Sequence, residues 1–169
     1  MPNTNKIKGK YFEEKIAKDY RDILKLSKLD CYRSSNSGAR ESIEYTGDIT
    51  FKDPLKYNLI TECKYYSSLK LEHIYPICNS YIDEWINQVF KEREHYKSQF
   101  NKEPLSIIIA SKPYLKDHYI IIVNDNDCFN QYDIIPKIVF YSKPNDRFFT
   151  LVSYSSIRLL FNSFSLIDS

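Results

Sequence analysis

The sequence predicts an α/β fold with a central mixed β-sheet flanked by helices. Two segments, residues 8–29 and 81–100, repeat apolar side chains three and four positions apart, which is typical of amphipathic helices. Two short apolar runs rich in β-branched residues follow at 105–110 and 119–123, and such runs are typical of buried strands. Helices and strands in this order pack as helices against a sheet.

A short strand and a loop of small residues follow the first helix. The strand covers Cys31–Arg33, and the loop is centred on Asn36-Ser37-Gly38. A β-hairpin is predicted next, with strands at 47–51 and 58–65 and a turn at Asp53-Pro54, which is a strong turn sequence. The second helix is followed by four strands and a short helix, at 105–110, 119–123, 138–141, 148–152 and 155–161.

The chain length suits one domain. Its 169 residues are enough for a substantial hydrophobic core and too few for two comfortable domains. We therefore expect residues 1–169 to form a single domain, with a mobile tail at residues 1–8 and a C-terminal extension of the same domain at 125–169.

Charge and composition narrow the class of protein. The net charge is only +2, but residues 1–40 carry ten basic and five acidic residues. A basic N-terminal segment suits a surface that faces phosphates, although a solvated helix has the same composition.

No apolar run reaches the roughly 18 residues of a membrane span, and no apolar signal segment is present, so we expect a cytoplasmic protein without a membrane partner. The four cysteines form no C-x-x-C pair, which argues against a zinc site.

Three charged residues lie in the predicted hairpin, where apolar residues would be expected. Glu62 and Lys64 are two positions apart and therefore share a face of their strand, with Ile60 before them on that face. Asp48 begins the partner strand, so we expect it beside Glu62 and Lys64. Two carboxylates held close together repel each other unless a cation lies between them, and Mg²⁺ or Mn²⁺ suits such hard oxygen ligands. The alternative is an exposed ion pair, because E-x-K occurs by chance in many proteins.

Glu13 is a further candidate on the first helix. It lies in line with Ala17, Tyr20 and Leu24, and hence on the apolar face or at its border. A carboxylate is costly to bury without a partner, and a metal ion or a basic group would supply one. The alternative is that Glu13 edges the apolar face and reaches water.

The small-residue loop and the second helix supply candidate DNA contacts. Gly38 allows the backbone to come close to a ligand, and serine hydroxyls with Arg33 and Arg40 suit phosphate oxygens. A plain flexible loop would have the same composition. Gln88 lies near the apolar face of the second helix, where it can hydrogen-bond a nearby site or pack at the edge of the core.

Together these residues resemble the PD-(D/E)xK nuclease superfamily, and most closely its archaeal and phage Holliday-junction resolvases. The resemblance covers about residues 8–66, and it rests on four motifs in order: Lys8-Gly9-Lys10-Tyr11-Phe12-Glu13, Arg33-Ser34-Ser35-Asn36-Ser37-Gly38, Gly47-Asp48-Ile49 and Glu62-Cys63-Lys64. It implies a restriction-endonuclease-like core and a metal-dependent endonuclease that acts as a homodimer on branched DNA.

The resemblance also implies roles for individual residues. The expected catalytic residues are Glu13, Ser37, Asp48, Glu62 and Lys64. The expected ligands of Mg²⁺ or Mn²⁺ are Glu13, Asp48, Glu62 and the backbone carbonyl of Cys63. The expected DNA contacts are Lys8, Lys10, Arg33, Ser35, Arg40 and Gln88.

One residue departs from the family pattern, because Gly47 stands where the family usually has proline. The sequence leaves other functions open: a restriction-type or repair endonuclease of the same fold, a non-catalytic DNA-binding module, or a small interaction protein with surface charges. We expect a phage-encoded protein that acts in the host cytoplasm.

Overall fold

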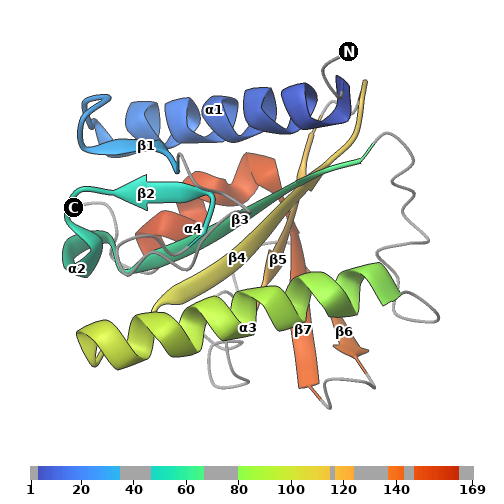
Figure 1. The fold of residues 1–169 in the computed structure, drawn as a ribbon. Coiled ribbons are helices and arrows are strands. Elements are labelled where there is room, and N and C mark those ends of the chain that lie inside the picture. Colours follow the sequence, from blue (N-terminus) through green and yellow to red (C-terminus); the bar gives the residue numbers. More distant parts are fainter. Residues whose placement is uncertain are drawn as a thin grey trace.

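A five-stranded mixed β-sheet with helices on both faces forms the centre of the structure (Figure 1). The strand order is β3 (Leu59–Tyr65), β4 (Leu105–Ser111), β5 (Tyr119–Ile122), β7 (Arg147–Ser153) and β6 (Lys137–Ser142). This computed structural model describes residues 4–34, 47–66, 80–114, 117–123, 137–142 and 147–163.

The direction of the strands makes the sheet mixed. Strands β3 and β4 are parallel and are connected through helix α3 (Ser80–Phe100), whereas the other neighbouring strands are antiparallel. Strand β3 forms one edge of the described sheet, so its outward amide and carbonyl groups need partners from elsewhere in the chain. The predicted α/β fold with a mixed sheet and flanking helices is confirmed.

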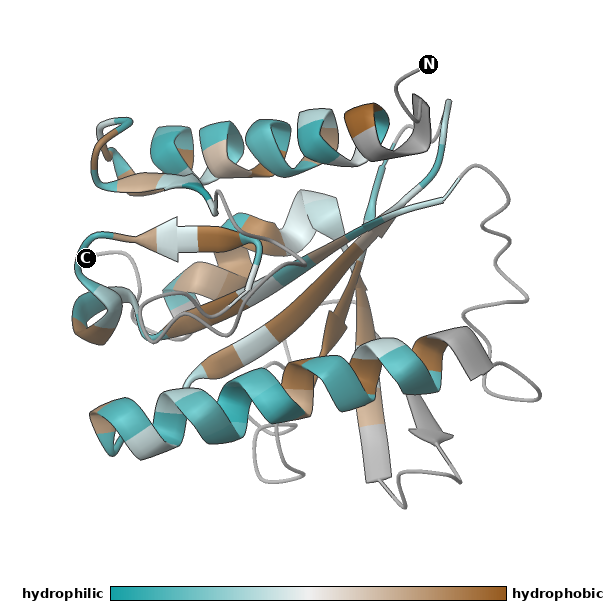
Figure 2. Cartoon of the chain, viewed as in Figure 1, coloured by the Kyte–Doolittle hydropathy of each residue, from teal (hydrophilic) through white to brown (hydrophobic). Residues whose placement is uncertain are grey.

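Side chains along the strands point alternately into two hydrophobic cores. Leu59 and Cys63 of β3 face one core, which includes helix α1 (Thr4–Leu24) and helix α4 (Ile157–Ser163). On the opposite face of the sheet, Ile108 of β4 belongs to the second core, which includes residues of α3. Hydrophobic residues accordingly concentrate on β4 and β5, and hydrophilic residues cover most of α1 and α3 (Figure 2). Burial of each such isoleucine contributes about 1.5–3 kcal/mol.

The predicted hairpin is wrong. Strand β2 (Ile49–Phe51) pairs antiparallel with β1 (Cys31–Arg33) in a separate two-stranded sheet, and not with β3. The Asp53-Pro54 sequence begins a short helix, α2 (Pro54–Tyr57), because the Asp53 carboxylate accepts the Lys56 N–H at 3.0 Å and proline suits the first helical turn. The chain therefore turns through a helix between the two strands.

The other element boundaries differ by a few residues from the predicted ones. Helix α1 begins at Thr4, so residues 4–8, which were expected in a mobile tail, are helical. It ends at Leu24 and not near Leu29, since Lys25 has a left-handed backbone with φ 54°. The predicted C-terminal helix is divided into a 3₁₀ turn at Tyr154–Ser156 and α4. Among the helices of the described residues, none is long and apolar enough to span a membrane.

Candidate active site

Asp48 connects the two-stranded sheet of β1 and β2 to the edge of β3 through hydrogen bonds. Its N–H donates to the Thr61 carbonyl at 2.8 Å, and its carboxylate Oδ2 accepts the Cys63 N–H at 2.8 Å. Both bonds use groups on the edge of β3 that pairs with no strand of the described residues. Asp48 is 5% exposed, so this carboxylate is buried against the strand that carries Glu62 and Lys64.

Gly47 makes this approach possible. Its φ is +82°, in the left-handed region, and a Cβ at this position would lie 2.7 Å from the Thr61 carbonyl oxygen. Proline fixes φ near −65°, so it cannot take the Gly47 backbone conformation. The departure from the family motif therefore has a structural cause.

Glu62, Lys64 and Gln88 form a closed hydrogen-bonded cluster between β3 and α3. Lys64 Nζ donates to Glu62 Oε1 at 2.7 Å and to Gln88 Oε1 at 2.8 Å, and Gln88 Nε2 donates to Glu62 Oε1 at 2.7 Å. The Glu62 and Lys64 side chains are only 6% and 14% exposed, so the alternative of an exposed ion pair does not hold. Gln88 hydrogen-bonds both members of the Glu62–Lys64 pair, and its expected contact with DNA stays a prediction.

Lys64 is a cation in this arrangement. Burial alone would lower its pKa, but the ion pair with Glu62 and the charge of Asp48 raise the pKa overall. A lysine that stays protonated cannot take a proton from water. It can donate hydrogen bonds to a phosphate oxygen or to a water molecule and stabilise negative charge that develops there.

The site holds an excess of negative charge around Asp48. Burial raises the pKa of Asp48 to about 8, and the charges of Glu62 and Glu13 add to the increase, although the Cys63 N–H and Lys64 lower it. Two neighbouring carboxylates raise a pKa in this way when no cation balances them. An additional cation would lower the pKa of Asp48.

Glu13 lies near Asp48 but is paired with Arg33. Its Oε2 is 3.2 Å from Arg33 Nη1, and both side chains are half-buried. The expected border position of Glu13 on α1 is therefore observed, and its partner is a basic group. The adjacent Glu14 forms an ion pair with Arg21 at the surface, 3.0 Å between Glu14 Oε1 and Arg21 Nη2.

Glu92 belongs to the same cluster and was not predicted. It lies one helical turn after Gln88, whose Nε2 donates to Glu92 Oε1 at 3.1 Å. Burial and the charge of Glu62 raise the pKa of Glu92 to about 7, and its Oε2 is buried without a partner in the described part of the chain. The spacing of four residues from Gln88 on one helix was the only signal in the sequence.

Comparison with known families identifies the chain. A family model described as "Phage putative PDDEXK endonuclease" matches residues 4–159. The chain belongs to this family. The predicted membership of the PD-(D/E)xK nuclease superfamily is thereby confirmed. The comparisons with curated proteins and with solved structures gave no match.

A PDDEXK endonuclease implies a divalent metal ion, and the residues at β3 fit such an ion in part. Asp48 and Glu62 supply hard carboxylate oxygens. The Cys63 carbonyl faces the same strand edge as the Cys63 N–H that Asp48 accepts, because both groups of a strand residue point to one side. Burial raises the pKa of the Cys63 thiol well above its usual value, so its sulfur remains protonated. Among the described residues, no group of three or more Asp, Glu, His or Cys side chains is arranged to hold an ion, consistent with Glu13 bound to Arg33.

The remaining predicted residues of this PDDEXK protein form no hydrogen bond or ion pair with the carboxylate cluster in the described part of the chain. Lys8 and Lys10 are exposed on the first turns of α1. Ser35, Ser37 and Arg40 lie outside the described residues.

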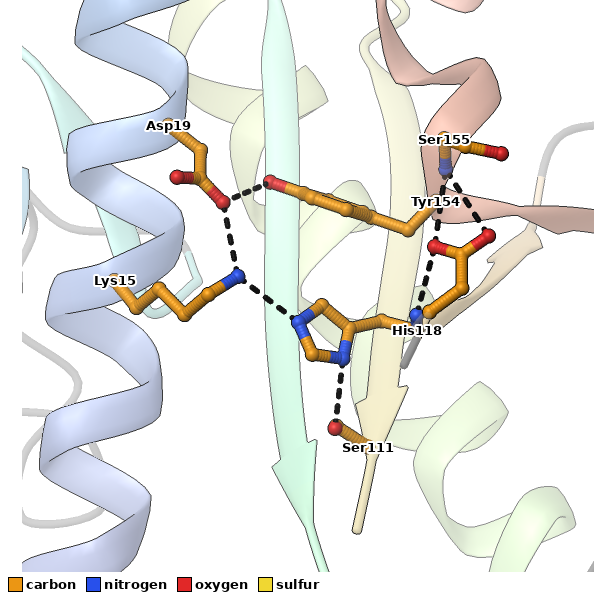
Figure 3. A network of polar contacts seen from close by, with 7 residues as sticks. Lys15, Asp19, Ser111, His118, Tyr154 and Ser155 are labelled. Carbon is orange, nitrogen blue, oxygen red and sulfur yellow. Dashed lines mark hydrogen bonds and ion pairs between the residues drawn. The ribbon is translucent and has the colours of Figure 1, made fainter. Parts of the chain in front are cut away.

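A polar network fixes α1, and with it Glu13, to the sheet (Figure 3). Lys15 Nζ lies 3.0 Å from His118 Nε2 and 3.2 Å from Asp19 Oδ2, and the Tyr154 hydroxyl donates to Asp19 at 3.2 Å. The Lys15 ammonium can only donate, so His118 Nε2 accepts and Nδ1 carries the proton towards Ser111 Oγ, 2.8 Å away. His118 is therefore neutral in this network.

Protonation of His118 should weaken the network. Burial lowers the pKa of His118, and Lys15 lowers it further, so the unfolded chain binds this proton more readily than the folded chain. The contribution of His118 to stability is thus present above about pH 6.5 and is lost as the pH falls. We expect the stability difference between the wild type and His118→Gln to shrink between about pH 7 and pH 5, measured by urea unfolding. A constant difference would contradict the assignment of a neutral His118.

Proposed function

We propose that the protein is a metal-dependent endodeoxyribonuclease that hydrolyses DNA phosphodiester bonds at the edge of β3 and, as a homodimer, resolves four-way junctions. The proposal rests on one observation: the Asp48 carboxylate is hydrogen-bonded to the edge of β3, beside a buried Glu62–Lys64 ion pair. Membership of a PDDEXK endonuclease family supports the nuclease class. The resolvase activity rests on the sequence motifs.

In the proposed mechanism, Asp48, Glu62 and the Cys63 carbonyl would hold Mg²⁺ or Mn²⁺. Such an ion lowers the pKa of water and polarises a phosphoryl oxygen. Lys64, held by Glu62 and Gln88, orients the attacking water or stabilises charge on the phosphate. Gln88 fixes the rotamers of both side chains.

Other residues have supporting roles in this proposal. Glu13 adds negative charge near Asp48, and it would be free to hold the metal ion if Arg33 bound a DNA phosphate in its place. The proposed DNA contacts are Lys8, Lys10, Arg33, Ser35, Arg40 and Gln88, and Ser37 would lie near the scissile phosphate. Two subunits would cut the two symmetric strands of a junction. The protein would act on DNA in the host cytoplasm.

Cleavage of a labelled four-way junction and of the matching linear duplex, with Mg²⁺ and with EDTA, tests the proposal. Symmetric cuts in the junction alone, lost in EDTA, are the expected result, with a dimer mass in light scattering. Cuts in both substrates would indicate a restriction-type or repair endonuclease and contradict the specific resolution of junctions. Tight DNA binding without cleavage would contradict the enzymatic proposal and indicate a non-catalytic module.

Lys64→Met is expected to lower the cleavage rate by about 10²–10³-fold, because it removes the cation that orients the attacking water or stabilises charge on the phosphate. It should also destabilise the fold by about 3 kcal/mol, since the buried Glu62 loses the positive charge that balances it and keeps only its hydrogen bond from Gln88. Single-turnover cleavage and urea unfolding measure the two effects. The exposed Lys28 offers a control, and Lys28→Met should change neither quantity. A Lys64→Met enzyme as fast as the wild type would contradict the role of Lys64.

A further inference from the structure

The face of β3 that carries Glu62 and Lys64 continues to an exposed aromatic ring. Side chains two positions apart share a strand face, so Tyr66 follows Lys64 on this face. The Tyr66 N–H donates to the Ser111 carbonyl at 3.0 Å, which extends the pairing with β4 by one residue and fixes the backbone. Tyr66 is nevertheless 41% exposed. An aromatic side chain of this size is therefore presented to solvent next to the candidate catalytic lysine.

A buried tryptophan holds the Tyr66 ring in place. Tyr66 stacks on Trp85 with 5.3 Å between ring centroids and 26° between the ring planes. Trp85 lies on α3, one turn before Gln88, and is itself buried in the core between α3 and the sheet. The Tyr66 ring is thus oriented before any ligand binds, which reduces the entropy lost on binding. Tyr114, which is fully exposed, has no such ring contact among the described residues.

We propose that Tyr66 stacks against an unpaired base next to the scissile phosphate, such as a base opened at the branch point of a junction, so that the enzyme prefers DNA with an unpaired nucleotide at the cut. This inference rests on the proposed nuclease function and names its substrate class. A base inside a duplex has both faces covered by its neighbours, whereas an unpaired base offers a free face to an aromatic side chain. Lys64 lies two residues earlier on the same face, and in the proposed mechanism it stabilises charge on the adjoining phosphate. The site would therefore recognise a base that has lost a stacking neighbour, and it would not recognise a particular base sequence.

Binding without metal tests the inference separately from cleavage. The probes are a labelled duplex with one unpaired nucleotide and the fully paired duplex, and their affinities are measured by fluorescence anisotropy in EDTA. The wild type should prefer the first probe, and Tyr66→Leu should reduce this preference by about tenfold, because one base–aromatic stack contributes about that factor. Tyr66→Phe keeps the ring and should restore the preference. Trp85 is the single tryptophan of the chain, so its emission should change when the unpaired probe binds the wild type.

Tyr114→Leu is the matched control, because it removes an exposed tyrosine that stacks on no described ring. It should keep the preference for the unpaired probe. An equal loss in Tyr114→Leu and Tyr66→Leu, or an unchanged preference in Tyr66→Leu with a wild-type melting temperature, would overturn the inference for Tyr66 and leave the nuclease proposal intact. A wild-type protein that binds neither probe and cuts neither of them nor the four-way junction in Mg²⁺ would overturn the proposed function itself.

Discussion

Asp48→Asn is expected to abolish DNA cleavage while the fold remains intact. Loss of a metal-binding carboxylate removes several kcal/mol of stabilisation from the transition state, which corresponds to a rate lower by about 10³-fold or more. The asparagine oxygen can still accept the Cys63 N–H, and the backbone bond from residue 48 to the Thr61 carbonyl is unaffected. Single-turnover cleavage in Mg²⁺ measures the loss.

The same substitution should stabilise the protein at neutral and alkaline pH in the absence of metal. The pKa of Asp48 is raised to about 8, so the folded chain binds this proton more tightly than the unfolded chain, and stability falls as the pH rises from about 4 to about 8. Asparagine carries no charge and removes this loss. Urea unfolding in EDTA should show a gain of about 2–5 kcal/mol for Asp48→Asn near pH 8 and little gain near pH 4. A variant less stable than the wild type at both pH values would contradict the conclusion that Asp48 is buried close to other carboxylates.

Gly47→Pro is expected to destabilise the protein and to inactivate it, although it restores the usual family motif. Proline cannot adopt the observed φ of +82°, and a Cβ would lie 2.7 Å from the Thr61 carbonyl oxygen. The cost should be about 3 kcal/mol or more, and Asp48 would be moved away from the edge of β3. Urea unfolding and cleavage of the same preparation measure both effects.

Gly9 provides the matched control for this position. Gly47→Ala should destabilise the protein, because the same Cβ meets Thr61. Gly9 lies inside α1, and among the described residues a Cβ there would have only Glu13 Oε1 nearby, at 4.0 Å. Gly9→Ala should therefore stabilise the helix by about 0.5–1 kcal/mol. Similar effects of alanine at both glycines would show that the tight contact of Gly47 with β3 is not present in solution.

The sequence was most informative where a local pattern determines the structure. The helical spacing over residues 81–100 predicted α3 to within one residue, and the β-branched runs predicted β4 and β5. The alternation of Ile60, Glu62 and Lys64 placed two charges on one face of β3, because side-chain direction in a strand depends only on position.

The sequence was less informative where distant contacts determine the structure. Asp53-Pro54 is typical both of a turn and of a helix start, and only the pairing of β1 with β2 distinguishes the two. Glu92 reads as a surface residue, since its burial depends on how α3 packs on β3. The Glu13–Arg33 ion pair joins α1 to β1, and no spacing in the sequence predicts it.

The most direct test of the central claim compares DNA cleavage by Glu62→Gln with cleavage by Glu14→Gln in Mg²⁺. Both substitutions remove one ion-paired carboxylate, but Glu62 is buried beside Asp48 and Glu14 lies at the surface with Arg21. The measurement is the rate at which labelled junction and duplex are cut under single-turnover conditions. We expect wild-type cleavage in Mg²⁺ and none in EDTA, the same rate for Glu14→Gln, and a loss of about 10³-fold or more for Glu62→Gln. Cleavage by Glu62→Gln at the wild-type rate would contradict a nuclease site at the edge of β3.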